Sequence, residues 1–541
     1  MPKSKFENEF TYKKFADSGK EQEFDGLFEN AVNEVRKTFG ANNPMYIGGK
    51  AVYSRDILTE KSPIDANIMI GKFQKGNAEH AKQAISAAQK ASAVWGTTDY
   101  RERAALFMKA ANIFAGEKFK LAAILSFENG KSRYESIGEV DEAIDFMRYY
   151  ANEMLLNKGY LRKTLFEKDM AKVGSGFQGA PGAAEQVAIS LKPYGVFGVI
   201  APFNFPISIP VGMCSAAMIT GNTVVFKPSS TDNMTMLSGL KIYELFKSAG
   251  LPDGVFNYIT GPGSVMGEEF VLNDAVSGIA FTGSKAAGLL MISNASRLGK
   301  RKAFVVEMGG KNPVIVTKHA NLDEAVSGIS SSAFGYSGQK CSCTSRVYVH
   351  ESIKELFISK LIDKARALKI GNPLEKGVYS GPLIGESAYL RYKESIDKAK
   401  ATGRVLYGGN AVKIGLSGFY VEPTVIEVGH DNELVHKELF LPIVTIEGFK
   451  SLDEAIVMAN DTDYGLTAGL YSSNKKEIKE FSSRVQAGVV YVNRAIGATT
   501  GAIVGVHAFG GWKNSSLTDK GTGSKYYLQE FMREQSLSVV K

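Results

Sequence analysis

Two of the chain's three cysteines, Cys341 and Cys343, lie close together in the run GYSGQKCSCTS, among small and polar residues. A thiol in such a loop can act as a nucleophile if a base activates it and a hydrogen-bond donor stabilises the oxyanion that forms. Most cysteines in loops have no such role. The case for Cys341 therefore depends on partners elsewhere in the sequence.

The usual partner of a nucleophilic cysteine is histidine, but no histidine lies in a glycine-rich or motif-like run, which weakens the case for a cysteine hydrolase. A carboxylate offers an alternative. In FVVEMGGKNP, Glu307 ends an apolar run that reads as a buried strand, and two glycines follow it and permit a close backbone approach. In PFNFP, Asn204 lies between aromatic residues and prolines, where a rigidly held amide can donate to an oxyanion. The six histidines are His80, His319, His350, His430, His436 and His507.

Short apolar runs alternate with helical patterns from about residue 194 onward. Strands are expected at 194–201, 222–227, 255–260, 276–282 and 302–309, with helices between them. This alternation predicts an α/β fold with a parallel sheet of the dinucleotide-binding kind, whose ligands bind at the carboxyl ends of the strands. A second alternating series runs from about residue 313 to 493. The first 160 residues read as mainly helical, and residues 172–191 as a loop and an extended ribbon.

Bulk composition fits a large water-soluble protein of two or three domains. The chain has 541 residues, of which 44% are hydrophobic and 22% charged. Its net charge of +8 is spread along the chain without a basic block, so no nucleic-acid partner is expected. Three cysteines and a polar N-terminus without a signal-peptide core indicate a reducing compartment, and we expect the cytoplasm. Residues 193–226 contain no charged residue and are long enough to span a bilayer. Their prolines and asparagines, however, favour buried strands and a helix over a membrane span.

Six motifs in this order resemble the aldehyde dehydrogenase superfamily, over nearly the whole chain: PFNFP, FKPSS, FTGS, EMGGKNP, GQKCS and KELFLP. The resemblance implies a Rossmann-like cofactor domain, a second α/β domain and a β-ribbon. It also implies a role for each central residue. Cys341 would attack the aldehyde carbon, Asn204 and the Cys341 N–H would stabilise the oxyanion, and Glu307 would activate the water that hydrolyses the thioester. Cys343 then needs no role, and no metal is implied.

The same resemblance implies the cofactor residues. Lys227 would reach the adenosine ribose and Ser284 a phosphate, while Glu438 and Phe440 would hold the nicotinamide ribose. NAD-specific members often carry an acid where this chain has Ser230, so we expect NADP to be accepted alongside NAD. The full set of expected cofactor residues is Lys227, Ser229, Ser230, Gly283, Ser284, Glu438 and Phe440.

The tail TTGAIVGVHAFGGWKNSS resembles the branch of this family that oxidises glutamate-γ-semialdehyde, the open form of 1-pyrroline-5-carboxylate, to glutamate. The resemblance implies that Ser342, Gly501 and Ala502 hold the substrate's α-carboxylate, which hydroxyl and backbone N–H groups can do without a cation. Glu142 would face the amino group. The resemblance further implies that two aromatic residues flank the aliphatic chain, Phe205 and Phe509. This chain departs from the branch at Ala508, where proline is usual, and at Phe203, where tryptophan is common.

The resemblance also predicts a domain plan. Residues 1–165 and 192–308 would form the NAD(P)-binding domain, and residues 309–500 the catalytic domain. Residues 166–191 and 501–541 would form an oligomerisation ribbon and a substrate-anchoring tail. We therefore expect a homo-oligomer, a dimer at least.

Three alternatives stay open at this point. The substrate could be another ω-semialdehyde or a simple aliphatic aldehyde. The same thiol and carboxylate could serve a cofactor-free esterase. A non-catalytic structural protein is the third, and the presence of Cys341, Glu307 and Asn204 together argues against it, because packing alone requires none of them.

Overall fold

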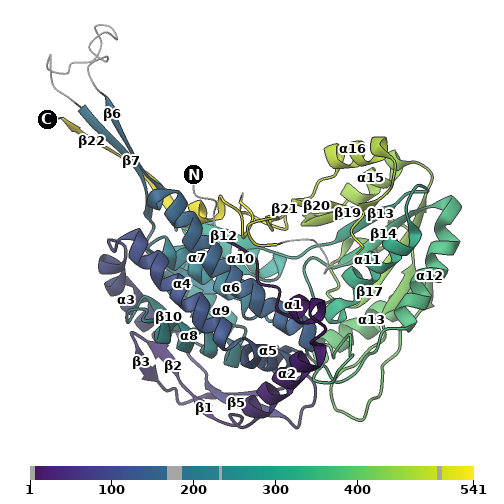
Figure 1. Ribbon diagram of the computed structural model, residues 1–541, viewed down its shortest axis with the longest axis horizontal. Helices are drawn as coiled ribbons and strands as arrows, with labels where there is room; N and C mark the ends of the chain where they lie inside the picture. Colours follow the sequence, from purple (N-terminus) through teal and green to yellow (C-terminus); the bar gives the residue numbers. More distant parts are fainter. Residues whose placement is uncertain (1–5, 167–184, 231–233, 496–502, 519, 541) are drawn as a thin grey trace, which may run out of the picture.

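Two seven-stranded sheets organise the chain, each in its own half of the molecule, and a narrow ribbon projects from the first half (Figure 1). The computed structural model describes residues 6–166, 185–230, 234–495, 503–518 and 520–540. This architecture confirms the α/β fold class expected from the alternating pattern.

The first sheet has the strand order β12-β11-β8-β9-β10-β2-β3. The five strands from β12 to β10 are parallel, and β2 and β3 add an antiparallel edge. Every residue of β8 and β9 is buried, as expected for central strands covered by helices on both faces. The strands are β12 Ala303–Glu307, β11 Val276–Thr282, β8 Val196–Ile200, β9 Thr223–Lys227, β10 Phe256–Tyr258, β2 Met45–Ile47 and β3 Lys50–Val52.

Helices cover this sheet. The longest, α6 (Arg133–Leu156), packs against α7 (Ser208–Ile219). Helix α7 is apolar on nearly all sides, and all of its residues except Ile209 are buried. Residues 193–226 thus form a strand, a buried helix and a strand. Among the described residues, no helix is both long and apolar enough to cross a bilayer. The other helices of this half are α1 Thr11–Asp17, α2 Glu21–Arg36, α3 Ala78–Trp95, α4 Tyr100–Gly116, α5 Lys118–Asn129, α8 Met236–Ala249, α9 Gly263–Leu272, α10 Lys285–Arg297 and the short 3₁₀ turns Lys158–Tyr160 and Tyr527–Phe531.

The expectation of a mainly helical N-terminal region was wrong for residues 42–74. That stretch holds β2, β3 and a small sheet of β1 (Asn42–Asn43), β4 (Ile57–Lys61) and β5 (Met69–Gln74). The missed signal is Gly48–Gly49, which join β2 to β3 with positive φ at both positions, the geometry of a two-residue hairpin. These strands are too short for the two-residue periodicity to stand out in the sequence.

The second sheet has the order β15-β16-β17-β14-β13-β19-β20 and is parallel except at β15. Its strands are β15 Arg404–Tyr407, β16 Thr424–Glu427, β17 Ile443–Phe449, β14 Thr344–His350, β13 Asn312–Val316, β19 Thr467–Tyr471 and β20 Val489–Val492. Its helices are α11 Leu322–Phe334, α12 Lys354–Arg366, α13 Glu386–Thr402, α14 Glu433–His436, α15 Leu452–Asn460, α16 Lys475–Arg484 and the 3₁₀ turns Gly335–Gly338 and Glu351–Ile353. Two short strands, β18 Tyr464–Gly465 and β21 Trp512–Lys513, pair beside it.

The projecting ribbon is an antiparallel sheet of β6 (Leu161–Phe166), β7 (Glu185–Pro193) and β22 (Met532–Val540). The C-terminal strand pairs with β7 along its whole length, from Met532 opposite Pro193 to Val540 opposite Glu185. The apolar side chains of Leu161, Ile189 and Leu537 are exposed on this ribbon. In the single chain, these three apolar side chains of the ribbon are therefore exposed to solvent.

Candidate active site

One large cavity, of about 1170 Å³, brings most of the predicted site residues together. On one side it is lined by the residues that end or follow β8, β11 and β12, neighbouring parallel strands of the first sheet. Carboxyl ends of parallel strands are where such sheets bind ligands. The other sides come from α6, from the loop before β14, from residues 438–440 and from the tail. The predicted residues that line it are Glu142, Asn204, Phe205, Ser229, Gly283, Ser284, Glu307, Cys341, Ser342, Glu438, Phe440 and Phe509.

Cys341 is half-buried in the loop before β14. The side-chain amide of Asn312 donates to the carbonyl of Cys341, with N and O 2.8 Å apart, which ties the loop to the start of β13. A Cβ on Gly310 would lie 2.3 Å from that carbonyl oxygen, so only glycine fits there. Burial, together with the charges of Glu438 and Glu307, raises the pKa of the Cys341 thiol above its usual range. The thiol therefore needs a base before it can act as a nucleophile.

Glu307 ends β12 and is nearly buried. The hydroxyl of Ser516 lies 3.0 Å from Oε1, while Oε2 has no hydrogen-bond partner among the described residues. Burial raises the pKa of Glu307 to about 8. A carboxyl group with a pKa near neutrality and one unoccupied oxygen is suited to take and return a proton.

The two glycines after Glu307 do permit close approaches, and the structure identifies both neighbours. One is the carbonyl of Cys341 beside Gly310. The other is the carboxylate of Glu438, from which a Cβ on Gly309 would be only 2.0 Å away. The N–H of Gly310 donates to Glu438 Oε1 at 2.7 Å, and burial raises the pKa of Glu438 to about 7. The EMGG run thus places a proton acceptor, the thiol loop and Glu438 against one another.

The cofactor residues divide into two groups. Ser284 is the N-cap of the 13-residue helix α10, which begins at the cavity wall, and helix N-termini bind phosphate. Phe440 has φ +60°, and its ring meets that of Phe203 edge-on at 5.8 Å. Lys227 and Ser230, in contrast, are buried beside the cavity and do not line it, and burial lowers the pKa of Lys227 to about 8.

Ser230 is of interest because the expectation for NADP depends on it. Its hydroxyl lies 2.9 Å from the carbonyl of Gly261 and 3.1 Å from that of Pro228, and it is fully buried. In this geometry the hydroxyl is engaged with backbone carbonyl groups. It adds neither an acid nor a charge near the cavity.

At the substrate end, Ser342, Phe205, Phe509 and Glu142 all line the cavity. Glu142 belongs to α6, and burial raises its pKa. Phe509 is held by two backbone hydrogen bonds with Thr522, N to O in each direction. Gly501 and Ala502, the other predicted carboxylate anchors, lie outside the described residues.

Comparison with known proteins identifies the family. The family model described as "Aldehyde dehydrogenase family" matches residues 54–537. The chain belongs to the aldehyde dehydrogenase family. This confirms the resemblance carried by the six motifs.

Individual proteins and solved structures similar to this aldehyde dehydrogenase support the same family. The chain is 36% identical over 517 residues to 1-pyrroline-5-carboxylate dehydrogenase 1 of Halalkalibacterium halodurans, covering 94% of this chain and 95% of that protein. The solved structure of a Thermus 1-pyrroline-5-carboxylate dehydrogenase with bound NAD superposes with a TM-score of 0.89 at 32% identity, over 100% of both chains. Lactaldehyde dehydrogenase from Escherichia coli superposes with a TM-score of 0.83 at 30% identity, over 92% of this chain and 99% of that one.

Two charged residues of this aldehyde dehydrogenase that the sequence did not reveal fix the loop around Asn204. Glu139 of α6 accepts the N–H groups of Ile207, at 2.8 Å, and of Ser208, at 3.2 Å, where α7 begins. Lys131 forms a fully buried ion pair with Glu139, and its Nζ lies 3.3 Å from the ring centre of Phe205. The pair therefore caps α7 and braces the loop that carries Asn204 and Phe205.

Nothing in the local sequence pointed to this pair. Glu139 shares its helix face with the polar residues Glu135, Ser136 and Glu142 at three- and four-residue spacing, so a further carboxylate there does not stand out. Its partner groups on α7 lie 68 and 69 residues later in the chain.

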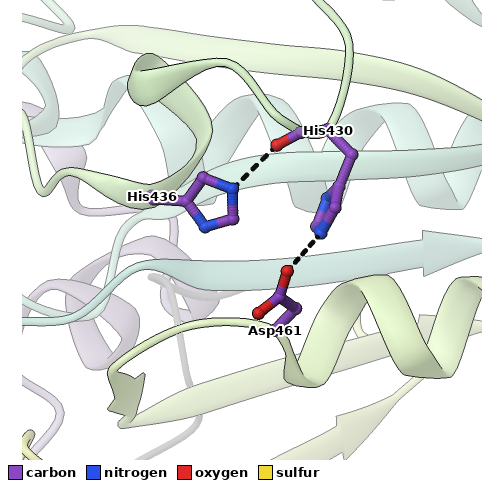
Figure 2. A group of neighbouring side chains, drawn as sticks. All are labelled: His430, His436 and Asp461. Carbon is purple, nitrogen blue, oxygen red and sulfur yellow. Dashed lines mark hydrogen bonds and ion pairs between the residues drawn. The ribbon is translucent and has the colours of Figure 1, made fainter.

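A separate cluster of possible metal ligands lies away from the cavity (Figure 2). His430 Nε2 lies 2.9 Å from Asp461 Oδ2, and His436 Nε2 lies 2.8 Å from the carbonyl of His430. The other ring nitrogen of His430 lies 3.2 Å from the hydroxyl of Tyr348. Imidazole and carboxylate groups can bind Zn²⁺, but these groups already engage one another, and the guanidinium of Arg346 lies beside the backbone of Asp461. We assign the cluster a structural role.

Proposed function

We propose that this aldehyde dehydrogenase oxidises L-glutamate-γ-semialdehyde, the open form of 1-pyrroline-5-carboxylate, to L-glutamate in proline degradation. The observation that carries the proposal is the shared cavity, in which Cys341 and Glu307 lie with Ser342, Phe205, Phe509 and Glu142. An acid, a hydroxyl and two aromatic walls match a short chain with a zwitterionic head. The names of the relatives of this chain support the same substrate.

The reaction would begin with proton transfer from the Cys341 thiol to a base, a role that suits Glu307. The sulfur would then attack the aldehyde carbon and form a thiohemiacetal. Its oxyanion would accept hydrogen bonds from the Asn204 amide and the Cys341 N–H. Preorganised donors are effective here because the amide is nearly buried and its loop is braced by the Lys131–Glu139 pair.

The cavity has features that fit a dinucleotide. The N-terminus of α10 can receive a phosphate, and Glu438 can accept ribose hydroxyls. When bound, NAD would accept the hydride that leaves the thiohemiacetal carbon, giving a thioester. Glu307, after releasing the thiol proton to solvent, would then take a proton from water, and the resulting hydroxide would attack the thioester. Glutamate would leave as Glu307 returns this proton to the Cys341 sulfur. We also propose that NADP is accepted, because no acid stands at Ser230.

We further propose that the protein is cytoplasmic and assembles as a homo-oligomer, a dimer at least. All three cysteines are free, which suits a reducing compartment. The ribbon of β6, β7 and β22 exposes Leu161, Ile189 and Leu537, and a partner chain would cover them. Light scattering of wild type and Leu537→Lys tests the assembly, and a monomeric wild type would contradict it.

The test of the substrate is a comparison of four reactions followed by absorbance of the reduced nicotinamide. Pyrroline-5-carboxylate and pentanal are each supplied with NAD and with NADP. We expect kcat/KM for pyrroline-5-carboxylate to exceed that for pentanal by about 100-fold or more, since the head group adds charged hydrogen bonds. Equal values would leave an aldehyde dehydrogenase for simple aldehydes. A nicotinamide-independent ester hydrolysis as the main activity would favour the esterase instead.

A further inference from the structure

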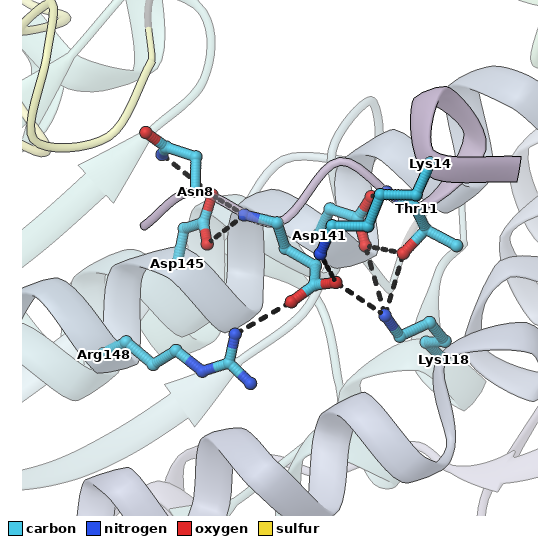
Figure 3. A network of polar contacts seen from close by, with 8 residues as sticks. Asn8, Thr11, Lys14, Lys118, Asp141, Asp145 and Arg148 are labelled. Carbon is cyan, nitrogen blue, oxygen red and sulfur yellow. Dashed lines mark hydrogen bonds and ion pairs between the residues drawn. The ribbon is translucent and has the colours of Figure 1, made fainter. Parts of the chain in front are cut away.

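The N-terminal strap, residues 6–11, runs along α6 and forms part of the cavity wall (Figure 3). Its backbone is held by two carboxylates of that helix. The N–H of Glu9 lies 2.9 and 3.1 Å from the two oxygens of Asp145, and the N–H and hydroxyl of Thr11 each lie 2.7 Å from an oxygen of Asp141. These contacts join residues 130 to 136 positions apart. The strap is thus fixed by tertiary contacts and has no regular secondary structure before Thr11.

Three cations hold the strap through the side chain of Glu9. The carboxylate of Glu9 pairs with Lys14 at 2.8 Å, with Arg148 at 2.9 Å and with Lys118 at 3.3 Å. Burial alone would raise the pKa of Glu9, but the hydrogen bonds from Lys14 and Arg148 and the charge of Lys118 lower it to about 2. Glu9 is therefore ionised at any physiological pH, and the strap stays paired with the surrounding cations.

The strap separates the roles of three neighbouring carboxylates on α6. Asp141, Glu142 and Asp145 all line the cavity. The strap donates hydrogen bonds to Asp141 and Asp145, which are four residues apart and so lie on one side of the helix. Glu142, between them, receives none of the strap's hydrogen bonds described above. Under the proposed function, Glu142 is the carboxylate of this group that would meet the cationic head of the substrate.

Asn8 connects the strap to the tail. Its amide nitrogen lies 2.9 Å from Asp145 Oδ2 and 3.0 Å from the carbonyl oxygen of Val504. Val504 lies in a turn closed by backbone hydrogen bonds between Ile503 and His507, and this turn leads directly to Phe509. One side chain thus links the helix that carries Glu142 to the turn that presents Phe509.

We propose that Asn8 is a positioning residue that sets the selectivity of the cavity for an amino-acid aldehyde, by holding the 503–509 turn against α6 at Asp145. The inference rests on the proposed function, because Glu142 and Phe509 are the groups that would meet the head and chain of the substrate. Asn8 itself need not touch the substrate. Its loss would change the distance between these two walls.

The experiment compares wild type, Asn8→Ala and Lys14→Ala in the full-length protein. Lys14→Ala is the matched control, since it removes a strap contact on the outer side and leaves both hydrogen bonds of Asn8. The first readout is kcat and KM for pyrroline-5-carboxylate and for pentanal. The second is hydrogen exchange of the amides in residues 503–509, which needs no substrate, and a melting curve checks that each variant is folded.

For Asn8→Ala we expect the ratio of kcat/KM between the two substrates to fall about fivefold or more, mainly through a higher KM for pyrroline-5-carboxylate. Exchange in residues 503–509 should be at least about fivefold faster, and Lys14→Ala should change neither readout. A ratio within twofold of wild type, or an unchanged exchange rate, would overturn the inference. If wild type shows no preference for pyrroline-5-carboxylate, the proposed function fails, and the exchange rate alone then decides whether Asn8 holds the turn.

Discussion

The two ends of the cavity are held in different ways. Around the thiol, the backbone itself sets the distances, because Gly309 and Gly310 let the Glu438 carboxylate and the Cys341 loop approach closer than any side chain would allow. At the substrate end, side chains from segments far apart in the sequence set the distances. One example is Asn8, which hydrogen-bonds to both Asp145 and Val504. Backbone contacts tolerate almost no change, whereas side-chain contacts can be altered singly. The first arrangement suits chemistry shared by a family, and the second suits a change of substrate.

The thiol should be essential whichever substrate is supplied. Replacing Cys341 with alanine removes the attacking atom, and we expect kcat to fall by at least about 1,000-fold for both pyrroline-5-carboxylate and pentanal. Reduced-nicotinamide absorbance measures the rate, and an unchanged melting temperature shows that the fold persists. Turnover near the wild-type level would mean that another group is the nucleophile.

A change in the backbone contact beside the thiol should affect both substrates equally. In Gly310→Ala the new Cβ would lie 2.3 Å from the Cys341 carbonyl oxygen, so the loop must move. A displacement of about 1 Å in a reacting group can lower the rate about 100-fold. We expect kcat to fall by that order for both aldehydes. Gly299→Ala is a control, because a Cβ at this exposed glycine meets no atom within 4 Å, although its φ of +63° adds a small strain.

The pH profile should report Glu307. Burial raises its pKa to about 8, so the carboxylate is largely protonated at pH 6 and largely ionised at pH 9. If the ionised form is the base, kcat/KM rises with pH, by roughly 10- to 100-fold over this interval. The rising limb should disappear in Glu307→Gln along with most of the activity. A profile that is flat from pH 6 to 9 in wild type would show that Glu307 does not titrate in the rate-determining step.

The smallest effect should be confined to the substrate end. Glu142→Gln removes a charge that would meet the substrate's amino group, and charge-assisted hydrogen bonds contribute about 1.5–3 kcal/mol. We expect KM for pyrroline-5-carboxylate to rise about tenfold and the values for pentanal to stay near wild type. Equal losses for the two aldehydes would erase the contrast between the ends of the cavity.

Each residue that we expect at the chemical centre lies within a short, recognisable motif of the sequence. The runs around Asn204 and Glu307 follow or end strands of the first parallel sheet, whose carboxyl ends lie at one edge, whereas the Cys341 loop precedes β14 of the second sheet. The same regularity made β8, α7 and β9 predictable. The fold class and the family are confirmed, whereas the individual roles of the site residues and the domain boundaries stay predictions.

What the sequence did not reveal depends on contacts between distant segments. Glu139 and Lys131 are ordinary charged residues until α6 packs on α7, and Asn8 has no local feature that relates it to Val504, 496 residues later. For Ser230, the sequence shows the residue type but not its contacts. Its type was informative, but only the tertiary structure shows that its hydroxyl is used by the backbone of Gly261.

The pairing of the C-terminal strand β22 with β7 has a consequence for biosynthesis. The first half of the molecule takes β22, and the Ser516 hydroxyl beside Glu307, from residues translated long after β7 and β12. A nascent chain that has been translated through β12 therefore contains all seven strands of the first sheet but lacks β22 and Ser516. Contacts of such long sequence separation form late and slowly. Until β22 has been translated, β7 lacks one of its two partner strands, and this is the interval in which a chaperone would be of most use.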